Sequence, residues 1–206
     1  MELVKLVRAA GFFISSIVTI SLAIMLLDII KSTLISLSGF AFVIPLFAGS
    51  IILRSRVWKK LYDVSRKLLY FVTAVLVLIL GFAVLIWFLF WASSQTVLYP
   101  LSDYAGMSTL IGISLLWAVY SLAEFISVYG LFHNKIYNLS KILLAPIILV
   151  EASLIFLIGD FSYALPISLF VLAASTAIIG LGFLFDNPKI NPANSRKASS
   201  LGRLYP

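Results

Sequence analysis

Two glutamates are the residues best placed to do chemistry in this chain, because each lies inside a long apolar stretch. Glu124 is the one carboxylate in "WAVYSLAEFISVYG", and Glu151 lies in the next apolar stretch. A charge at the centre of a bilayer costs at least about 2.5–3.5 kcal/mol, so such acids usually serve a proton, a cation or a partner. At 1.5 Å per helical residue their depths differ by about 6 Å, which is within reach of two side chains on neighbouring helices.

Three serines accompany Glu124 at spacings of seven, three and three residues. These spacings predict one polar stripe on a helix that faces the inside of a bundle. The stripe consists of Ser114, Ser121, Glu124 and Ser127.

Three roles for the two acids remain open. They can form a carboxyl pair that binds a proton or cation, as in proton relays and coupled transporters. Alternatively, Glu124 extends to the cytoplasmic interface while Glu151 bonds a neighbouring helix or a basic group of a partner subunit. In the third interpretation, both acids pair with another chain across an interface.

Most other site chemistry does not fit the sequence. The chain has no cysteine, which excludes thiolate metal sites, iron–sulfur clusters and cysteine nucleophiles. His133 is the only histidine and lies between two apolar stretches, so a bis-histidine haem site or a histidine-based zinc cluster is not expected. No G-x-S-x-G motif occurs. We therefore predict no metal, no cofactor and no enzymatic activity.

Six apolar stretches must position these residues. The chain of 206 residues is 62% hydrophobic and 11% charged, whereas soluble domains average about 45–50% and about 25%. A membrane core about 30 Å thick requires roughly 20 apolar residues per helix, and stretches of alternating β type would be shorter. The sequence predicts an all-α integral membrane protein in which residues 1–185 form a six-transmembrane-helix bundle. The predicted spans cover residues 9–30, 34–53, 68–91, 107–129, 142–158 and 163–185.

The basic residues predict the orientation of the bundle. Of the 15 Lys and Arg residues, all but Lys31 fall at the N-terminus, in the second and fourth loops or in the C-terminal tail. Cytoplasmic loops carry such an excess, so we expect a multi-pass protein of the cell membrane with both termini cytoplasmic. The net charge of +7 then needs no nucleic acid as a partner. Residues 186–206 are rich in Pro, Asn and Ser and predict a flexible basic tail.

The second loop, "RSRVWKKLYDVSRKLLY", separates apolar from basic residues at helical spacing. This pattern predicts an interfacial amphipathic helix between the second and third spans, continuous with the third. Each basic residue near an anionic leaflet contributes about 1 kcal/mol, so anionic lipids are possible partners, and simple anchoring is the alternative. The expected headgroup contacts are Arg54, Arg56, Lys59, Lys60, Arg66, Lys67 and Trp58.

The sixth stretch carries small residues at four-residue spacing, which permits close helix contact within the bundle, with another subunit or in a homo-oligomer. They are Ala173 with Ala177, and Thr176 with Gly180.

The predicted spans contain no deeply placed Asn, Gln, Lys or Arg, which disfavours a carrier of polar solutes. Two function hypotheses remain. The chain is either a non-catalytic accessory or structural subunit of a membrane complex, or a small proton- or cation-coupled transporter or channel that uses Glu124 and Glu151.

Overall fold

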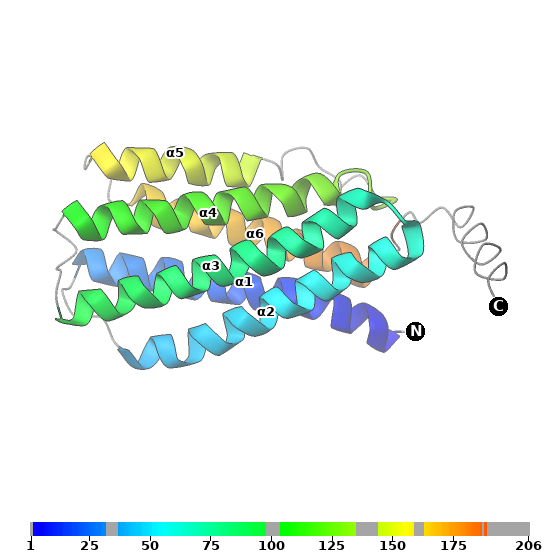
Figure 1. Ribbon diagram of the computed structural model, residues 1–206, viewed down its shortest axis with the longest axis horizontal. Coiled ribbons are helices and arrows are strands. Elements are labelled where there is room, and N and C mark those ends of the chain that lie inside the picture. The colour runs from blue at the N-terminus through cyan, green and yellow to red at the C-terminus, as the bar shows by residue number, and fades with distance from the viewer. Residues whose placement is uncertain are drawn as a thin grey trace, which may run out of the picture.

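The computed structural model describes residues 2–31, 37–97, 104–134, 144–158, 163–186 and 188, and these residues form α-helices without any strand. The helices run back and forth along one long axis (Figure 1). The prediction of an all-helical fold is confirmed. The helices are α1 (Glu2–Lys31), α2 (Leu37–Ser65), α3 (Leu68–Val97), α4 (Tyr104–Val128), α5 (Leu144–Ile158) and α6 (Ala164–Phe185).

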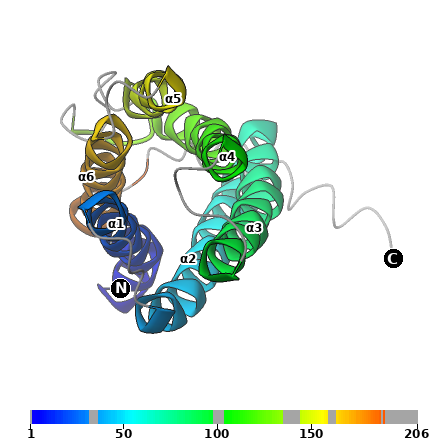
Figure 2. The same ribbon diagram turned by 90° about the vertical axis from the view of Figure 1, so that its left-hand side faces the viewer.

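The helices form a closed ring. Each packs against the helix before it and the helix after it in the sequence, and α6 closes the ring by packing along α1. Figure 2 shows this ring from one end. Buried apolar side chains from every helix make one continuous core. The ring therefore has an inner side, which the core fills, and an outer side.

Four helices of the described residues are long and apolar enough to cross a membrane, over residues 5–27, 68–87, 111–128 and 164–185. A chain with several such helices is a multi-pass membrane protein. α5 is apolar but shorter, with 15 residues. α2 has 29 residues, which corresponds to a length of about 44 Å and exceeds the membrane core of about 30 Å.

The junction of α2 and α3 differs from the predicted one. α2 continues without interruption to Ser65, so the segment is continuous with the second predicted span, and the predicted continuity with the third span is wrong. The chain instead reverses at Arg66, whose φ of 57° is in the left-handed region, and its N–H donates to the carbonyl of Tyr62 at 2.6 Å. The apolar face of this segment is buried inside the bundle, as Val57 and Trp58 show.

The segment after α4 folds back against the end of α6. Gly130 has a φ of 72°, which glycine adopts without steric cost, and the turn brings Phe132 into the core with 0% exposure. A Cβ atom on Gly182 would lie 2.7 Å from the Phe132 ring, so glycine is needed for this contact. The Asn134 N–H donates to Asp186 Oδ2 at 2.7 Å and holds the two segments together. The predicted flexible tail lies, from residue 189 on, outside the described residues.

Candidate functional site

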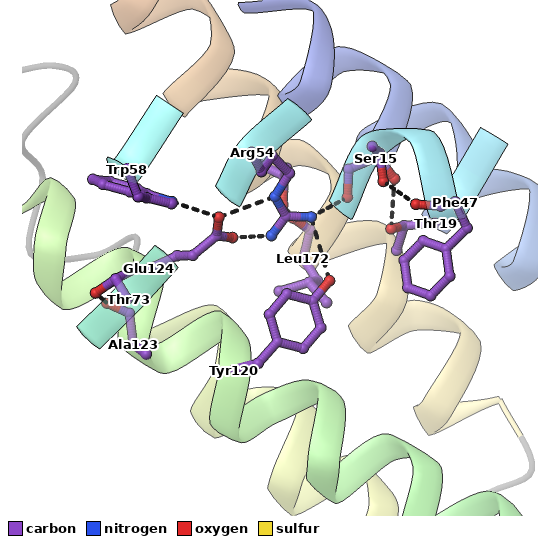
Figure 3. Close-up of polar contacts among 12 residues, drawn as sticks. Ser15, Thr19, Phe47, Arg54, Trp58, Thr73, Tyr120, Ala123, Glu124 and Leu172 are labelled. Atoms are coloured by element: carbon purple, nitrogen blue, oxygen red, sulfur yellow. Dashed lines mark hydrogen bonds and ion pairs between the residues drawn. The ribbon is translucent and has the colours of Figure 1, made fainter. Parts of the chain in front are cut away.

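A buried ion pair between Arg54 of α2 and Glu124 of α4 lies inside the ring (Figure 3). The guanidinium and the carboxylate meet in a two-pronged contact, in which Nε donates to Oε1 at 3.0 Å and Nη2 donates to Oε2. The exposed fractions of the two side chains are 2% and 0%. Two-pronged arginine–carboxylate contacts are among the strongest polar contacts in proteins, and here neither charge reaches solvent.

Both members of the pair make further hydrogen bonds to neighbouring side chains. Arg54 Nη1 donates to Ser15 Oγ of α1 and to the Tyr120 hydroxyl, the latter at 3.3 Å. The Trp58 Nε1–H donates to Glu124 Oε1 at 2.8 Å. Glu124 thus accepts three hydrogen bonds and Arg54 donates four, so the pair joins α1, α2 and α4.

Helical spacing explains how these side chains meet. Arg54 and Trp58 are four residues apart on α2, and Tyr120 and Glu124 are four residues apart on α4. Residues at this spacing share a helix face, so each helix presents two adjacent groups to the other. Gly11 allows α1 to approach α2 closely next to the ion pair, because a Cβ at this position would lie 3.2 Å from Arg54 Cγ.

Aromatic rings cover the pair toward the end of the bundle where α2 ends, hereafter the basic end. Adjacent ring centroids in this aromatic cluster are 5.1–6.3 Å apart. The guanidinium also lies over two rings, with its carbon 5.6 Å from the Phe12 centroid and 5.2 Å from the Tyr120 centroid, as cation–π contacts require. The cluster consists of Phe12, Trp58, Tyr70, Phe132 and Phe183.

A second aromatic contact lies on the opposite side of the pair. Phe47 of α2 and Trp117 of α4 have centroids 5.3 Å apart, and each lies seven residues, about two turns, from Arg54 or Glu124. The ion pair is therefore enclosed between two layers of rings, where removal of either charge would leave the other without a solvent partner.

The predicted polar stripe of α4 lies on the inner side of the ring. Ser114, Ser121, Glu124 and Ser127 are all buried. The Ser127 hydroxyl is 2.6 Å from the Thr73 hydroxyl of α3, so the stripe joins α4 to α3 as well as to α2.

The predicted contact between Glu124 and Glu151 is absent from this structure. Glu124 points into the ring toward α2, whereas Glu151 is exposed on α5 and has no hydrogen-bond or ion-pair partner among the described residues. The sequence predicted the similar depths of Glu124 and Glu151, but depth does not determine which side of a helix carries the side chain, and the two acids lie on sides that do not face each other.

Two of the predicted headgroup contacts are wrong, because Arg54 and Trp58 are buried at 2% and 0% exposure. Arg54 directly follows the predicted second span, residues 34–53, and its side chain lies inside the bundle. The signal that could have identified Arg54 was its spacing of four and seven residues from Trp58 and Leu61, which places all three on the apolar face. The other five residues of that prediction are exposed: Arg56, Lys59, Lys60, Arg66 and Lys67.

The small residues of α6 contact α1 inside the bundle. Ser16 Oγ of α1 donates to the Ala173 carbonyl at 2.8 Å, and a Cβ on Gly180 would lie 3.1 Å from the Phe13 ring. Thr176 is buried and Ala177 is partly buried. These residues therefore bring two helices of the same chain close together.

No three His, Asp or Glu side chains converge as a metal site within the described part of the chain. No protein-family model matches the sequence, and comparisons with curated proteins and with solved structures give no significant match. The role of the Arg54–Glu124 site is therefore inferred from its contacts and burial alone.

Proposed function

We propose that this chain is a non-catalytic accessory or structural subunit of a membrane complex. In this proposal six helices lie in the cell membrane and both termini are cytoplasmic. The observation that carries it is the set of three hydrogen bonds that buried Glu124 accepts from Arg54 and Trp58. An acid that is neutralised by its own chain has little capacity to exchange a proton or a cation, because removal of its partner charge is costly.

The enclosure of the site also argues against catalysis. A catalytic group must reach a substrate atom at hydrogen-bond distance. Here the charged pair lies between the aromatic cluster and the Phe47–Trp117 contact and is 0–2% exposed, and its polar neighbours Ser15 and Tyr120 bond to Arg54. The proposal accordingly includes no enzymatic activity and no cofactor.

The transporter or channel hypothesis requires Glu124 and Glu151 to act together, and their opposite orientations argue against it. We expect the purified protein in proteoliposomes to show no proton or cation flux. A flux that is abolished by both Glu124→Gln and Glu151→Gln, with folding retained, would favour the transporter instead.

Anionic lipids are proposed as further partners at the basic end. The exposed cations Arg56, Lys59 and Lys60 follow the outer face of α2, and Arg66 and Lys67 lie at its turn into α3. Polybasic clusters of this kind attract anionic headgroups.

The direct test of the subunit proposal is purification in mild detergent with identification of bound chains. The expected result is a stable association with other membrane proteins in a fixed ratio. A solitary monodisperse monomer obtained from native membranes would contradict the proposal.

The orientation can be tested separately, because the chain has no cysteine and single-cysteine variants are therefore labelled at one place. A membrane-impermeant maleimide added to intact cells should label Ser102→Cys and leave Ser199→Cys unlabelled. The reverse pattern would place both termini outside.

A further inference from the structure

Glu151 lies on a face of α5 that the rest of the bundle leaves uncovered. The opposite side of α5 is buried against the core, for example at Ala145, Leu149 and Ala152. We call the uncovered side the α5 outer face. It consists of Leu144, Ile147, Glu151, Leu154 and Ile155, all of which are exposed; Ile147, Leu154 and Ile155 lie three or four residues from Glu151, and Leu144 lies seven residues from it.

Glu151 is the middle residue of α5, seven residues from Leu144 and seven from Ile158. At 1.5 Å per residue it is about 10 Å from either end of the helix, farther than a glutamate side chain can extend. The carboxyl group therefore lies among lipid chains unless another molecule covers it, and an uncovered charge there is strongly unfavourable. Among the described residues, the acid inside the bundle, Glu124, is paired with Arg54 of the same chain, whereas Glu151 has no such partner.

We propose that the α5 outer face docks a transmembrane helix of a different protein, which carries a lysine or arginine at the depth of Glu151. The inference depends on the proposed subunit function and specifies the chemistry of the partner. The four apolar residues of the face supply packing area, and the carboxylate selects a helix with a complementary charge at one register.

A second copy of this chain fits the face less well. A two-fold contact would place Glu151 against Glu151 of the other copy, which brings together two groups of the same charge. A contact with another face of the copy would need a basic residue at mid-depth. Among the described residues, Arg54 is buried and bound to Glu124. The exposed cation farthest from a helix end is Arg56, which lies nine residues before the end of α2 and belongs to the basic cluster with Lys59 and Lys60.

The first experiment measures whether Glu151 is covered in native membranes. Dicyclohexylcarbodiimide is an apolar reagent that couples to carboxyl groups within membranes, and the modified peptide is identified by mass. We expect Glu151 to be modified at least about tenfold more slowly in native membranes than in the purified, dissociated chain. Glu124 is the internal control and should stay unmodified in both. Equal rates for Glu151 in the two samples would overturn the inference.

The second experiment tests the charge of the partner with synthetic helices. The purified full chain is reconstituted in vesicles with a leucine-rich transmembrane peptide that carries one central lysine, or with the same peptide lacking it. Energy transfer between labelled chain and labelled peptide reports association. We expect the lysine peptide to bind about tenfold more tightly, and Glu151→Gln to abolish this difference. The matched control Leu154→Ala, on the same face, should retain the preference. Equal binding of the two peptides to the wild-type chain would overturn the inference.

The two proposals fail in different ways. If the complex isolated in mild detergent survives Glu151→Gln unchanged, the docking inference is wrong and the subunit function stands. If no bound chain is recovered and Glu151 reacts freely in native membranes, the subunit function fails, and the docking inference fails with it.

Discussion

Replacement of Arg54 by methionine tests whether the buried ion pair holds the bundle together. Arg54 donates four hydrogen bonds, two of them to Glu124. In Arg54→Met the Glu124 carboxylate, which is 0% exposed, keeps only the Trp58 N–H as a donor. Removal of one member of a buried pair costs about 3–5 kcal/mol, so we expect the free energy of unfolding to fall by that amount.

The double variant Arg54→Met/Glu124→Met separates this explanation from a simple loss of packing. It leaves no buried charge, and only the neutral hydrogen-bonding groups of Trp58, Ser15 and Tyr120 lose partners. Replacing both members of a buried pair by apolar residues is often close to neutral. We expect a loss of at most about 2 kcal/mol, less than that of either single variant, and therefore a large coupling energy between the two positions.

Unfolding in mixed micelles with increasing denaturing detergent, followed by tryptophan fluorescence, measures these differences. Arg56→Met is the matched control, because Arg56 is two residues along the same helix and exposed; its effect should stay within about 0.5 kcal/mol. If Arg54→Met is no more destabilising than Arg56→Met, the buried ion pair does not hold the bundle together. The same conclusion follows if the losses of the two single variants simply add in the double variant.

Two further substitutions test the surroundings of the pair. Gly182→Ala should lower the free energy of unfolding by about 1–3 kcal/mol, because the added Cβ would lie 2.7 Å from the Phe132 ring. Gly49→Ala is the matched control. No atom lies within 4 Å of its added Cβ, so this variant should be neutral or stabilising in the same unfolding assay. Trp58→Phe keeps a ring but removes the N–H that donates to Glu124. A hydrogen bond to a charged group contributes about 1.5–3 kcal/mol, so we expect the free energy of unfolding to fall by that amount. An unchanged unfolding midpoint would contradict the assigned hydrogen bond.

The helical class was predictable because a membrane core of fixed thickness requires apolar stretches of about 20 residues, and such stretches can be identified in the sequence alone. The inward orientation of Ser121, Glu124 and Ser127 was likewise readable, since residues spaced by three or seven share a helix face.

The partner of Glu124 was not predicted, because Arg54 is 70 residues away in the sequence and directly follows the predicted end of a span. Charged residues at such boundaries usually reach headgroups. Whether Arg54 faces lipid or the ring interior depends on the rotation of α2 about its axis, which its packing against α1 and α3 determines. The same limitation applies to Glu151, whose depth could be estimated from the sequence but whose direction could not.

The ion pair also fixes the axial register of the helices that it joins. Arg54 lies 11 residues before the end of α2, and Glu124 lies four residues before the end of α4, which correspond to about 16 Å and about 6 Å. With the two groups in contact, α2 must extend about 10 Å beyond α4 at the basic end. Lys59 and Lys60 lie on this extension. In the proposed orientation the extension reaches the headgroup layer, because α4 ends near the membrane boundary. The contact that neutralises Glu124 therefore also determines how far the cations of α2 project toward the lipid surface.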